Sequence, residues 1–387
     1  MNIMTSKKLL FGLVLLSSVT CVNKKELSNL DVKSILHEVQ NQLEVQLISA
    51  EMTNRIPRTL NKDGSVQWTD PKFDWTEGFF PGSCWYMFDF TGDKKWKNAA
   101  EKFQNLFEGH KLRTDNHDLG FVFNSSFGNG YRLTNNEKFK DILITAGDSL
   151  LTRFNPIVGC IKSWDVYSGW QSERDWKFPV IIDNMMNLEL LFKLSEWTGN
   201  PVYQEVAIIH ANTTLANHFR KDNSSYHVID YDPVSGKVRK RETAQGLANN
   251  SSWARGQAWG LYGFTVCYRY TKDVQYLNMA NKIAEHIIRN LPEDGIPYWD
   301  YDAPDIPVAF RDASAAAIVA SALIELNSYS DINYSKKINL ILTTLGSKEY
   351  TSELGDNQGF ILEHSVGSIP HKVEIDVPLN YADYYYI

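Results

Sequence analysis

A recurring pair of helical segments, joined by a Thr-Gly-Asp-like turn, constrains the fold of this chain more than any other feature. In each copy an apolar helical run leads into the turn, and an amphipathic run follows it. The turns fall at residues 91–93, 198–200 and 271–273, and weaker copies fall at 134–136 and 330–331. Gly or Asn suits the left-handed end of one helix, and Asp or Asn can cap the start of the next. The pattern therefore predicts a series of helical hairpins.

The spacing of these copies predicts the number of hairpins. It averages roughly 60 residues, which accommodates two helices of about 15 residues each together with their loops. At this spacing about 360 residues supply roughly six pairs, which bury a continuous core by stacking. We predict an all-α fold in which six helical hairpins close into an (α/α)6 barrel. An open helical solenoid is the alternative, and the uneven spacing counts against it. Residues 226–241 alone suggest a small β-hairpin.

The first residues of the chain are typical of a secretory signal rather than of a folded domain. Two lysines precede an apolar run at residues 9–16, and small residues then lead to Cys21. The run is too short for a permanent membrane span, and no other stretch of the sequence approaches one. We predict that residues 1–21 are a signal peptide and that residues 22–387 form the barrel domain.

The stretch that ends at Cys21 also resembles a loose bacterial lipoprotein cleavage box. Cleavage there would leave Cys21 as an acylated first residue, and the lipid would anchor the protein to a membrane. Two locations stay open on this evidence: the periplasm, or a bacterial membrane to which the protein is lipid-anchored. In both cases we expect an exported protein.

The remaining cysteines and the net charge exclude several classes of protein. Cys84, Cys160 and Cys267 show no CxxC spacing, which excludes a zinc site or a disulfide framework and predicts small buried side chains. A net charge of −7 makes nucleic acid a poor partner. Aromatic residues make up 13% of the chain, which suits stacking on sugar rings, although aromatic residues also fill cores.

Two aspartates stand where loops lead into helical segments. Asp118 follows a histidine, and Asp183 follows two isoleucines and lies close to two methionines. A helix cap would explain either position. A cap does not explain the apolar neighbours of Asp183, where desolvation should raise the pKa of the carboxyl, as a general acid near neutral pH requires. Two acids that face one pocket are the arrangement that sugar hydrolases use.

Aromatic and basic residues cluster in the other long loops. Trp253, Arg255 and Trp259 predict two aromatic plates around one guanidinium that could bind a carboxylate, and a stacked structural arginine is the alternative. Trp75 lies in an aromatic loop and would either stack on a sugar or close a barrel end. The basic run at residues 237–241 is either a solvated loop or an attraction for an anionic substrate.

Together these segments resemble the unsaturated glucuronyl hydrolases of glycoside hydrolase family 88. The resemblance runs from about Leu27 to the C-terminus, and is carried by WARGQAW at 253–259, DNMM at 183–186, HDLGF at 117–121 and the segment 374–385. It implies an (α/α)6 barrel, in agreement with the count of repeats. It also implies action on lyase-cut oligosaccharides whose terminal uronic acid carries a C4=C5 double bond, without a metal or an organic cofactor.

The resemblance assigns roles to individual residues. Asp183 would protonate C4 and activate water for attack at C5, after which the ring opens and the glycosidic link breaks. Asp118 would be the second essential acid, which orients the ring or stabilises developing charge. Arg255 would bind the substrate carboxylate, and either Trp164 or Trp170 would supply a further aromatic contact. The sugar pocket would be lined by Trp75, His227, Gln245, Trp253, Arg255 and Trp259.

Three residues near the end of the chain resemble a sulfate-binding cluster. Some family members that accept sulfated glycosaminoglycan disaccharides carry two serines and a lysine there, and Ser365, Ser368 and Lys372 are similar, with Lys372 further along than in that pattern. The alternative is an ordinary Ser-rich surface loop.

Other functions compete with that of a glucuronyl hydrolase. An unsaturated rhamnogalacturonyl hydrolase would share the chemistry and act on pectin fragments, but the GQAW stretch and the tryptophans around Arg255 favour the glucuronyl branch. A non-catalytic glycan-binding lipoprotein would not need both Asp118 and Asp183. A solenoid scaffold for protein partners would leave the Trp–Arg–Trp arrangement unexplained.

Overall fold

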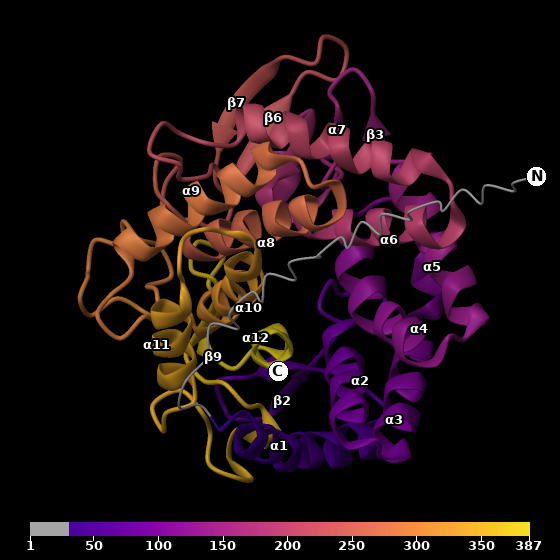
Figure 1. Cartoon of the computed structure of the whole chain (residues 1–387), viewed down its shortest axis with the longest axis vertical. Coiled ribbons are helices and arrows are strands. Elements are labelled where there is room, and N and C mark those ends of the chain that lie inside the picture. Colours follow the sequence, from indigo (N-terminus) through magenta and orange to yellow (C-terminus); the bar gives the residue numbers. More distant parts are fainter. Residues whose placement is uncertain (1–30) are drawn as a thin grey trace, which may run out of the picture.

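Helices arranged in a ring dominate the structure (Figure 1). The computed structural model describes residues 31–387, so the predicted signal peptide and Cys21 lie outside the described residues. Five helical hairpins follow one another around the ring as the chain proceeds. They are α2 (Phe79–Thr91) with α3 (Lys94–Gln104), η2 (Gly120–Gly128) and α4 (Asn129–Thr134) with α5 (Glu137–Leu151), α6 (Leu188–Thr198) with α7 (Pro201–Asn217), α8 (Ala254–Thr271) with α9 (Val274–Asn290), and α10 (Ala313–Tyr329) with α11 (Ser335–Leu345).

The predicted turns have the predicted capping geometry. Gly92 ends α2 with φ 70°, and the side chain of Asp93 accepts a hydrogen bond from the backbone N–H of Lys95 at the start of α3. Asn200 and Asp273 cap α7 and α9 in the same way. The third copy differs in one detail, because Lys272 rather than Gly or Asn takes the left-handed position after α8. The short Thr-Gly-Asp phrase is therefore a reliable signal for these hairpins.

The sixth helical pair joins the two ends of the described chain. The short helix α12 (Asn380–Tyr386) packs between α10 and α2 and so completes the inner ring. The long helix α1 (Val32–Thr53) takes the outer position beside it, and Ile35 and Tyr386 line one cavity. The barrel is closed, which confirms the (α/α)6 prediction and shows that an open solenoid was the wrong alternative. The two helices of this sixth pair are far apart in the sequence, so no turn joins them as it joins the other five pairs.

Small side chains allow the inner helices to approach one another. α10 begins with Ala-Ser-Ala-Ala-Ala, and its residues from Ala313 to Ala320 are all buried between α8 and α12.

Cys84, Cys160 and Cys267 are buried free thiols, as their spacing predicted. No helix within residues 31–387 combines the length and the apolar character that a membrane span requires.

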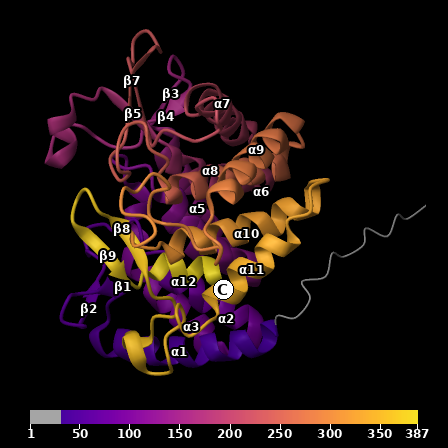
Figure 2. The same cartoon turned by 90° about the vertical axis from the view of Figure 1, so that its left-hand side faces the viewer.

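The connections at one end of the barrel form small antiparallel sheets, which gather along one edge in Figure 2. The predicted hairpin within residues 226–241 is present, and β5 adds a third strand to it. These connections also contain short helical turns, so most of the long loops at this end have a fixed shape. The strands are β1 (Pro57–Leu60) with β2 (Val66–Trp68), β3 (Phe154–Asn155) with β4 (Cys160–Ile161), β5 (Phe178–Ile181) with β6 (Val228–Tyr231) and β7 (Val238–Glu242), and β8 (Ser365–Ser368) with β9 (Val373–Val377).

Candidate active site

Asp183 stands directly after the buried strand β5, in the short helical turn η4 (Ile182–Asn187) that leads into α6. The backbone at this point is fixed by the pairing of β5 with β6. Ile182 and Met185 are fully buried beside it, and Asp183 itself is only 9% exposed. Burial raises the pKa of Asp183 to about 7, against the opposing effect of the nearby Arg255 charge. The carboxyl is thus set to hold a proton near neutral pH and to give it up.

His227 faces Asp183 as a neutral hydrogen-bond donor. Its Nδ1 accepts hydrogen bonds from the backbone N–H groups of Ala244 and Gln245 at 3.1 and 3.2 Å, so the ring proton resides on Nε2. Burial, with the charge of Arg255, holds the pKa of His227 well below its usual range. Nε2 lies 3.6 Å from Asp183 Oδ2, and neither atom has a hydrogen-bond partner within residues 31–387. Two buried polar atoms that face each other without a bond are suited to hold a water molecule or a substrate oxygen.

A second histidine–aspartate pair lies across from the first. His117 is fully buried, and burial lowers its pKa to about 3, so its ring is neutral. Its Nδ1 is 3.2 Å from the side-chain amide nitrogen of Asn187, and its Nε2 is 3.2 Å from Asp118 Oδ1. The pair repeats the arrangement of His227 and Asp183, with the imidazole Nε2 directed at a carboxylate.

A glycine brings the two pairs together. Gly120, at the start of η2, touches η4 so closely that a Cβ placed on it would lie 2.4 Å from Asn187 Cα. The next residue, Phe121, donates its backbone N–H to Asn187 Oδ1 at 3.0 Å. Only glycine allows this approach, because any other residue would force η2 and η4 apart. The contact therefore holds the start of the segment after Asp118 against the turn that carries Asp183.

The two carboxyl groups influence one another. Burial raises the pKa of Asp118 well above its usual range, and the negative charge of Asp183 raises it further. Asp118 is 7% exposed and lines a cleft of about 690 Å³, which we call the catalytic cleft. Because ionisation of either acid opposes ionisation of the other, the pair readily holds one proton or more near neutral pH.

Trp164 connects both halves of the site. Its ring is edge-on to His117 at 6.5 Å and to His227 at 6.1 Å between centroids. Trp170 also lines the catalytic cleft, but it packs on Trp164 and on His371, at 5.1 and 4.8 Å, rather than on His117 or His227. Of the two tryptophans that the sequence left open, Trp164 is therefore the one next to the acids.

Trp75 lines the same cleft and is held by other aromatic rings. Its ring centroid is 4.9 Å from that of Tyr381 in α12 and 5.5 Å from that of Phe121. The side chain is half-buried, so part of the indole is supported from behind and part faces the cleft. This position fits the stacking role better than the alternative of a plug at the barrel end.

Arg255 is buried in the wall of the site, and its surroundings differ in part from the prediction. The guanidinium lies over the ring of Trp253 at 4.8 Å, as expected, but the second ring is that of Tyr381 at 5.5 Å. Trp259 is fully buried instead and packs on Phe121 at 5.1 Å. Helical spacing places residues 255 and 259 on one face of α8. Tyr381 of α12, from the far end of the chain, nevertheless supplies the second ring beside Arg255.

The hydrogen bonds of Arg255 explain its fixed orientation. Nη1 donates to Asp312 Oδ2 at 3.1 Å and to the carbonyl of Val366, and Nη2 donates to the carbonyl of Gly367 at 2.6 Å. All three bonds use the Nη1 and Nη2 atoms. The side-chain amide of Gln245 reaches the same Gly367 carbonyl at 3.3 Å, so Gln245 and Arg255 share one wall.

The three residues of the predicted sulfate cluster differ in burial and in hydrogen bonding. Ser365 is fully buried, and its hydroxyl accepts a hydrogen bond from the backbone N–H of Ser314. Ser368 is buried and bonds to His371 at 2.7 Å. Both serines belong to β8, whereas Lys372 lies beyond the end of that strand, is exposed with a left-handed backbone, and lines another groove. The sulfate subsite of Ser365, Ser368 and Lys372 stays a prediction.

Two residues of the basic run at 237–241 are paired with acids. The run forms most of β7, where Arg239 bonds to Asp230 of β6 at 2.5 Å and Lys240 lies 3.3 Å from Asp175, which precedes β5. These pairs favour the interpretation of a paired surface strand over that of a substrate attractant.

Some residues of the site were absent from the sequence prediction. His117, Asn187, Asp312 and Tyr381 each touch a predicted site residue. His117 could have been found from the sequence, because it directly precedes Asp118. The other three act across the fold, and no local pattern marks them.

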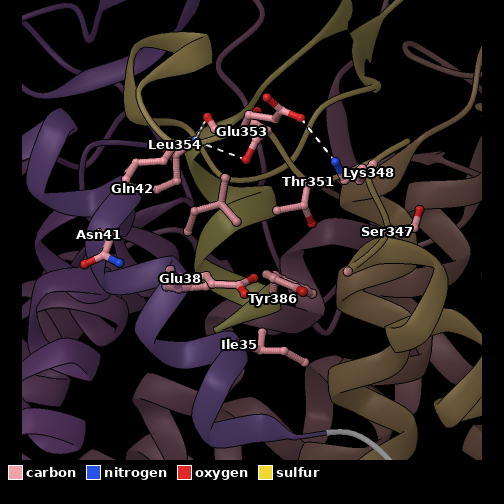
Figure 3. Close-up of a pocket in the computed structure, with 14 residues that line it drawn as sticks. Ile35, Glu38, Asn41, Gln42, Ser347, Lys348, Thr351, Glu353, Leu354 and Tyr386 are labelled. Carbon is pink, nitrogen blue, oxygen red and sulfur yellow. Dashed lines mark hydrogen bonds and ion pairs between the residues drawn. The ribbon is translucent and has the colours of Figure 1, made fainter.

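A second hollow lies away from these acids, at the junction of α1, α11 and α12 (Figure 3). We call this hollow of about 440 Å³ the seam cavity. Gln42 crosses its wall, donating to the carbonyls of Ser352, Glu353 and Phe360 and accepting from the backbone N–H of Gly355. The side-chain amide of Gln42 is thus bonded within the protein, and neither of the histidine–aspartate pairs lines the seam cavity.

Comparison with known proteins gives a consistent result. The family model described as Glycosyl Hydrolase Family 88 matches residues 48–386. The chain is 42% identical to an unsaturated glucuronyl hydrolase of Formosa agariphila, over 98% of this chain and 95% of that protein. It is 31% identical to an unsaturated chondroitin disaccharide hydrolase of Streptococcus agalactiae, over 95% of this chain and 92% of that protein.

Solved structures agree with the fold and extend the comparison. An unsaturated glucuronyl hydrolase specific for heparin is 46% identical, with a TM-score of 0.85 over 90% of this chain and 94% of that one. The unsaturated glucuronyl hydrolase of Bacillus sp. GL1, described as responsible for the degradation of glycosaminoglycan, is 29% identical, with a TM-score of 0.83 over the same shares.

Proposed function

The chain belongs to glycoside hydrolase family 88, and from that premise we propose that it removes the 4,5-unsaturated uronic acid from the non-reducing end of lyase-generated glycosaminoglycan oligosaccharides. The observation that carries the proposal is the paired arrangement of two buried acids, Asp118 and Asp183, each faced by a neutral histidine. Relatives named for glucuronyl and chondroitin substrates support a uronate-terminated fragment as the substrate.

The first step is hydration of the C4=C5 double bond. Asp183, whose pKa is raised to about 7, donates its proton to C4 of the enol ether, and positive charge develops on C5 and the ring oxygen. A water molecule then adds its oxygen to C5, and its proton passes to the carboxylate of Asp183. The acid is thereby restored, and the net change is the addition of one water molecule across the double bond.

His227 is placed to hold the attacking water. Its Nε2–H and Asp183 Oδ2 face each other at 3.6 Å without a mutual hydrogen bond, so an oxygen between them can accept from the imidazole and donate to the carboxylate. Asp118 supplies negative charge or a hydrogen bond beside the oxocarbenium-like cation, depending on its protonation.

The hydrated sugar then decomposes by ring opening and loss of the glycosidic bond, and no second water molecule is consumed. The C5 hemiketal opens as the bond from C5 to the ring oxygen breaks, which gives a ketone at C5. The former ring oxygen remains on C1 as a hydroxyl beside the glycosidic oxygen. Collapse of that hemiacetal to an aldehyde releases the rest of the oligosaccharide as an alcohol. One water molecule is consumed in all.

The walls of the site are suited to a flat, negatively charged ring. Arg255 Nε and the Gln245 amide lie on one side for the carboxylate, and Trp253 supports the arginine at 4.8 Å. Trp75 and Trp164 line the catalytic cleft and offer indole faces to the sugar.

The direct test follows the double bond. The protein is incubated with lyase-generated unsaturated disaccharides, and we expect the ultraviolet absorbance of the C4=C5 bond to disappear. Asp183→Asn should lower that rate by about 10³-fold or more because it removes the proton donor, while disaccharide binding measured by calorimetry persists. A rate for Asp183→Asn within a few-fold of the parent would refute its role as the acid.

The same assay separates the other functions. A pectin-specific sibling would consume unsaturated rhamnogalacturonan fragments in preference to glycosaminoglycan disaccharides. A non-catalytic binding protein would bind both without loss of absorbance. The names of the relatives favour the glucuronyl function over the pectin-specific one, and the presence of both Asp118 and Asp183 favours an enzyme over a binding protein.

We further propose that the protein is exported and that Cys21 carries a lipid anchor, on the strength of the sequence pattern of residues 1–21. The expectation is that the protein partitions into the detergent phase of a Triton X-114 extraction and that Cys21→Ser moves it to the aqueous phase. Aqueous partitioning of the unchanged protein would contradict the anchor and leave a periplasmic enzyme.

A further inference from the structure

A second groove continues from the outer end of the catalytic cleft. It has a volume of about 690 Å³ and lies between the β1–β2 hairpin and β9, and we call it the hairpin groove. Arg58 and Gln67 line both hollows, so the catalytic cleft and the hairpin groove meet at these two side chains. Figure 2 shows β1, β2, β8 and β9 together along one edge of the molecule, and β1 bridges to the segment after β9 at Thr59 and Leu379.

The charge of the hairpin groove is opposite to that of the chain as a whole. The chain has a net charge of −7, whereas the groove is lined by Arg58, Lys62 and Lys372 and by a single carboxylate, that of Glu374. That carboxylate is already bonded to Arg58, at 2.5 Å, which in turn bonds Asp74 in the cleft. Within the described residues Lys62 and Lys372 have no acidic partner. A local excess of positive charge attracts anionic ligands.

Part of the lining of the hairpin groove is apolar. Leu60, Val373, Ile375 and Val377 supply it, and Val373 is 50% exposed. A lining that combines apolar and cationic side chains suits a sulfated or carboxylated sugar, which has apolar ring faces and charged substituents at its edge. A disaccharide that reaches Asp118 with its unsaturated ring would occupy the cleft and leave the groove free, since the two hollows are distinct.

We propose that the hairpin groove is a subsite for the third and later sugars of an anionic oligosaccharide, and that Lys62 and Lys372 bind the sulfate or carboxylate groups of those sugars. This subsite rests on the proposed function, because the unsaturated end must lie at Asp118 and Asp183. It gives Lys372 a place beside Lys62 and not beside the serines of β8. The enzyme should therefore distinguish its substrates by length as well as by their unsaturated end.

The test compares chain lengths. The kcat/KM for an unsaturated chondroitin sulfate tetrasaccharide and for the matching disaccharide is measured with the full chain at low ionic strength. We expect the tetrasaccharide to be preferred, and Lys62→Gln/Lys372→Gln to lower the ratio of the two values by about 3- to 10-fold. The matched control Lys138→Gln/Lys336→Gln, which removes two exposed lysines from α5 and α11, should leave the ratio unchanged. Added salt should shrink the preference.

Each outcome decides the proposal. If the ratio is the same in the Lys62→Gln/Lys372→Gln variant and in the control, the hairpin groove is not a sugar subsite. Disaccharide turnover would still support the proposed function. If no substrate is turned over, the proposed function fails, and calorimetric binding of the tetrasaccharide still tests the groove. Equal affinity of the parent and the groove variant would then refute it, and weaker binding by that variant alone would support it.

Discussion

The catalytic centre and the seam cavity are both hollows with polar side chains, but they differ in how those polar atoms are bonded. At the catalytic centre the facing atoms of His227 and Asp183 are buried without a partner within residues 31–387. At the seam cavity the amide of Gln42 is bonded to backbone groups on both its oxygen and its nitrogen. Unbonded buried polar atoms cost stability, and others occur in the described residues, for example Gln46 Nε2 and Trp96 Nε1. What distinguishes the site at Asp183 from the seam cavity is that two such atoms, on Asp183 and His227, face each other at 3.6 Å.

The sharpest test of this contrast is Asp118→Asn, for which we expect opposite effects on activity and stability. The rate on unsaturated disaccharides should fall by about 10²- to 10³-fold, because the second carboxyl is lost beside the reacting ring. Stability should rise, and more at pH 8 than at pH 5. Burial raises the pKa of Asp118 in the folded protein, so the folded state becomes less stable as the pH rises above the pKa that this carboxyl has in the unfolded chain. Asparagine does not ionise and avoids that loss.

Thermal unfolding at the two pH values measures this prediction, alongside the absorbance assay. A variant that loses activity and stability together at both pH values would show that Asp118 is mainly structural.

Gln42→Leu at the seam cavity should give the reverse pattern. Three carbonyls and one N–H lose their partner, so the free energy of unfolding should fall by about 1–3 kcal/mol. Activity at 25 °C should stay within two-fold of the parent, since the cavity is remote from both acids. Urea unfolding checks the first value, with Asn41→Leu, an exposed neighbour, as the control that should change stability by less than about 0.5 kcal/mol. A large loss of activity in folded Gln42→Leu would break the contrast.

The pH dependence of the rate tests the protonation of Asp183. The general acid must carry its proton, and its pKa is raised to about 7, so kcat/KM should be high below pH 7 and fall above it. The fall should approach about tenfold per pH unit once the carboxyl is ionised. The measurement is a pH–rate profile from pH 5 to 9 on the disaccharide, with unfolding temperatures recorded at each pH. A flat profile between pH 6 and 9 would exclude Asp183 as the titrating acid.

The smallest expected effect concerns Asp312, which pairs with Arg255 inside the wall of the site. The positive charge of Arg255 lowers the pKa of Asp183, and Asp312 offsets that charge. Asp312→Asn should keep the cap of α10 through Oδ1 but strengthen the field of Arg255, and move the alkaline fall in activity to lower pH by less than about one unit. Asp294→Asn, which removes a similar partner from Arg311, is the control and should leave the profile in place. A shift to higher pH would contradict the offset.

Local patterns predicted the elements that local contacts determine. The Thr-Gly-Asp phrase found the hairpins because the cap and the left-handed turn are made by adjacent residues, such as Gly92 and Asp93. The apolar surroundings of Asp183 were visible as neighbouring isoleucines and methionines, and the structure places it in a buried turn with a raised pKa.

Long-range packing determined what the sequence pattern missed. The sixth helical pair escaped detection because α1 and α12 stand at opposite ends of the described chain. The second ring beside Arg255 was assigned to Trp259 from helical spacing, whereas Tyr381 of α12 fills that place. Ser365, Ser368 and Lys372 were grouped by their resemblance to a sulfate-binding cluster, and the sequence did not show that Lys372 lies beyond the end of β8 with a left-handed backbone.

The position of α12 also links the order of folding to the appearance of activity. A hydrogen bond from the hydroxyl of Thr59 to the carbonyl of Pro378 joins residues that are 319 positions apart, so the last wall of the ring forms only after almost the whole domain has been synthesised. Tyr381 arrives with that wall and packs on both Trp75 and Arg255. A nascent chain with five hairpins in place would still lack the side chain that packs on Trp75 and Arg255. The appearance of enzyme activity should therefore follow completion of the barrel.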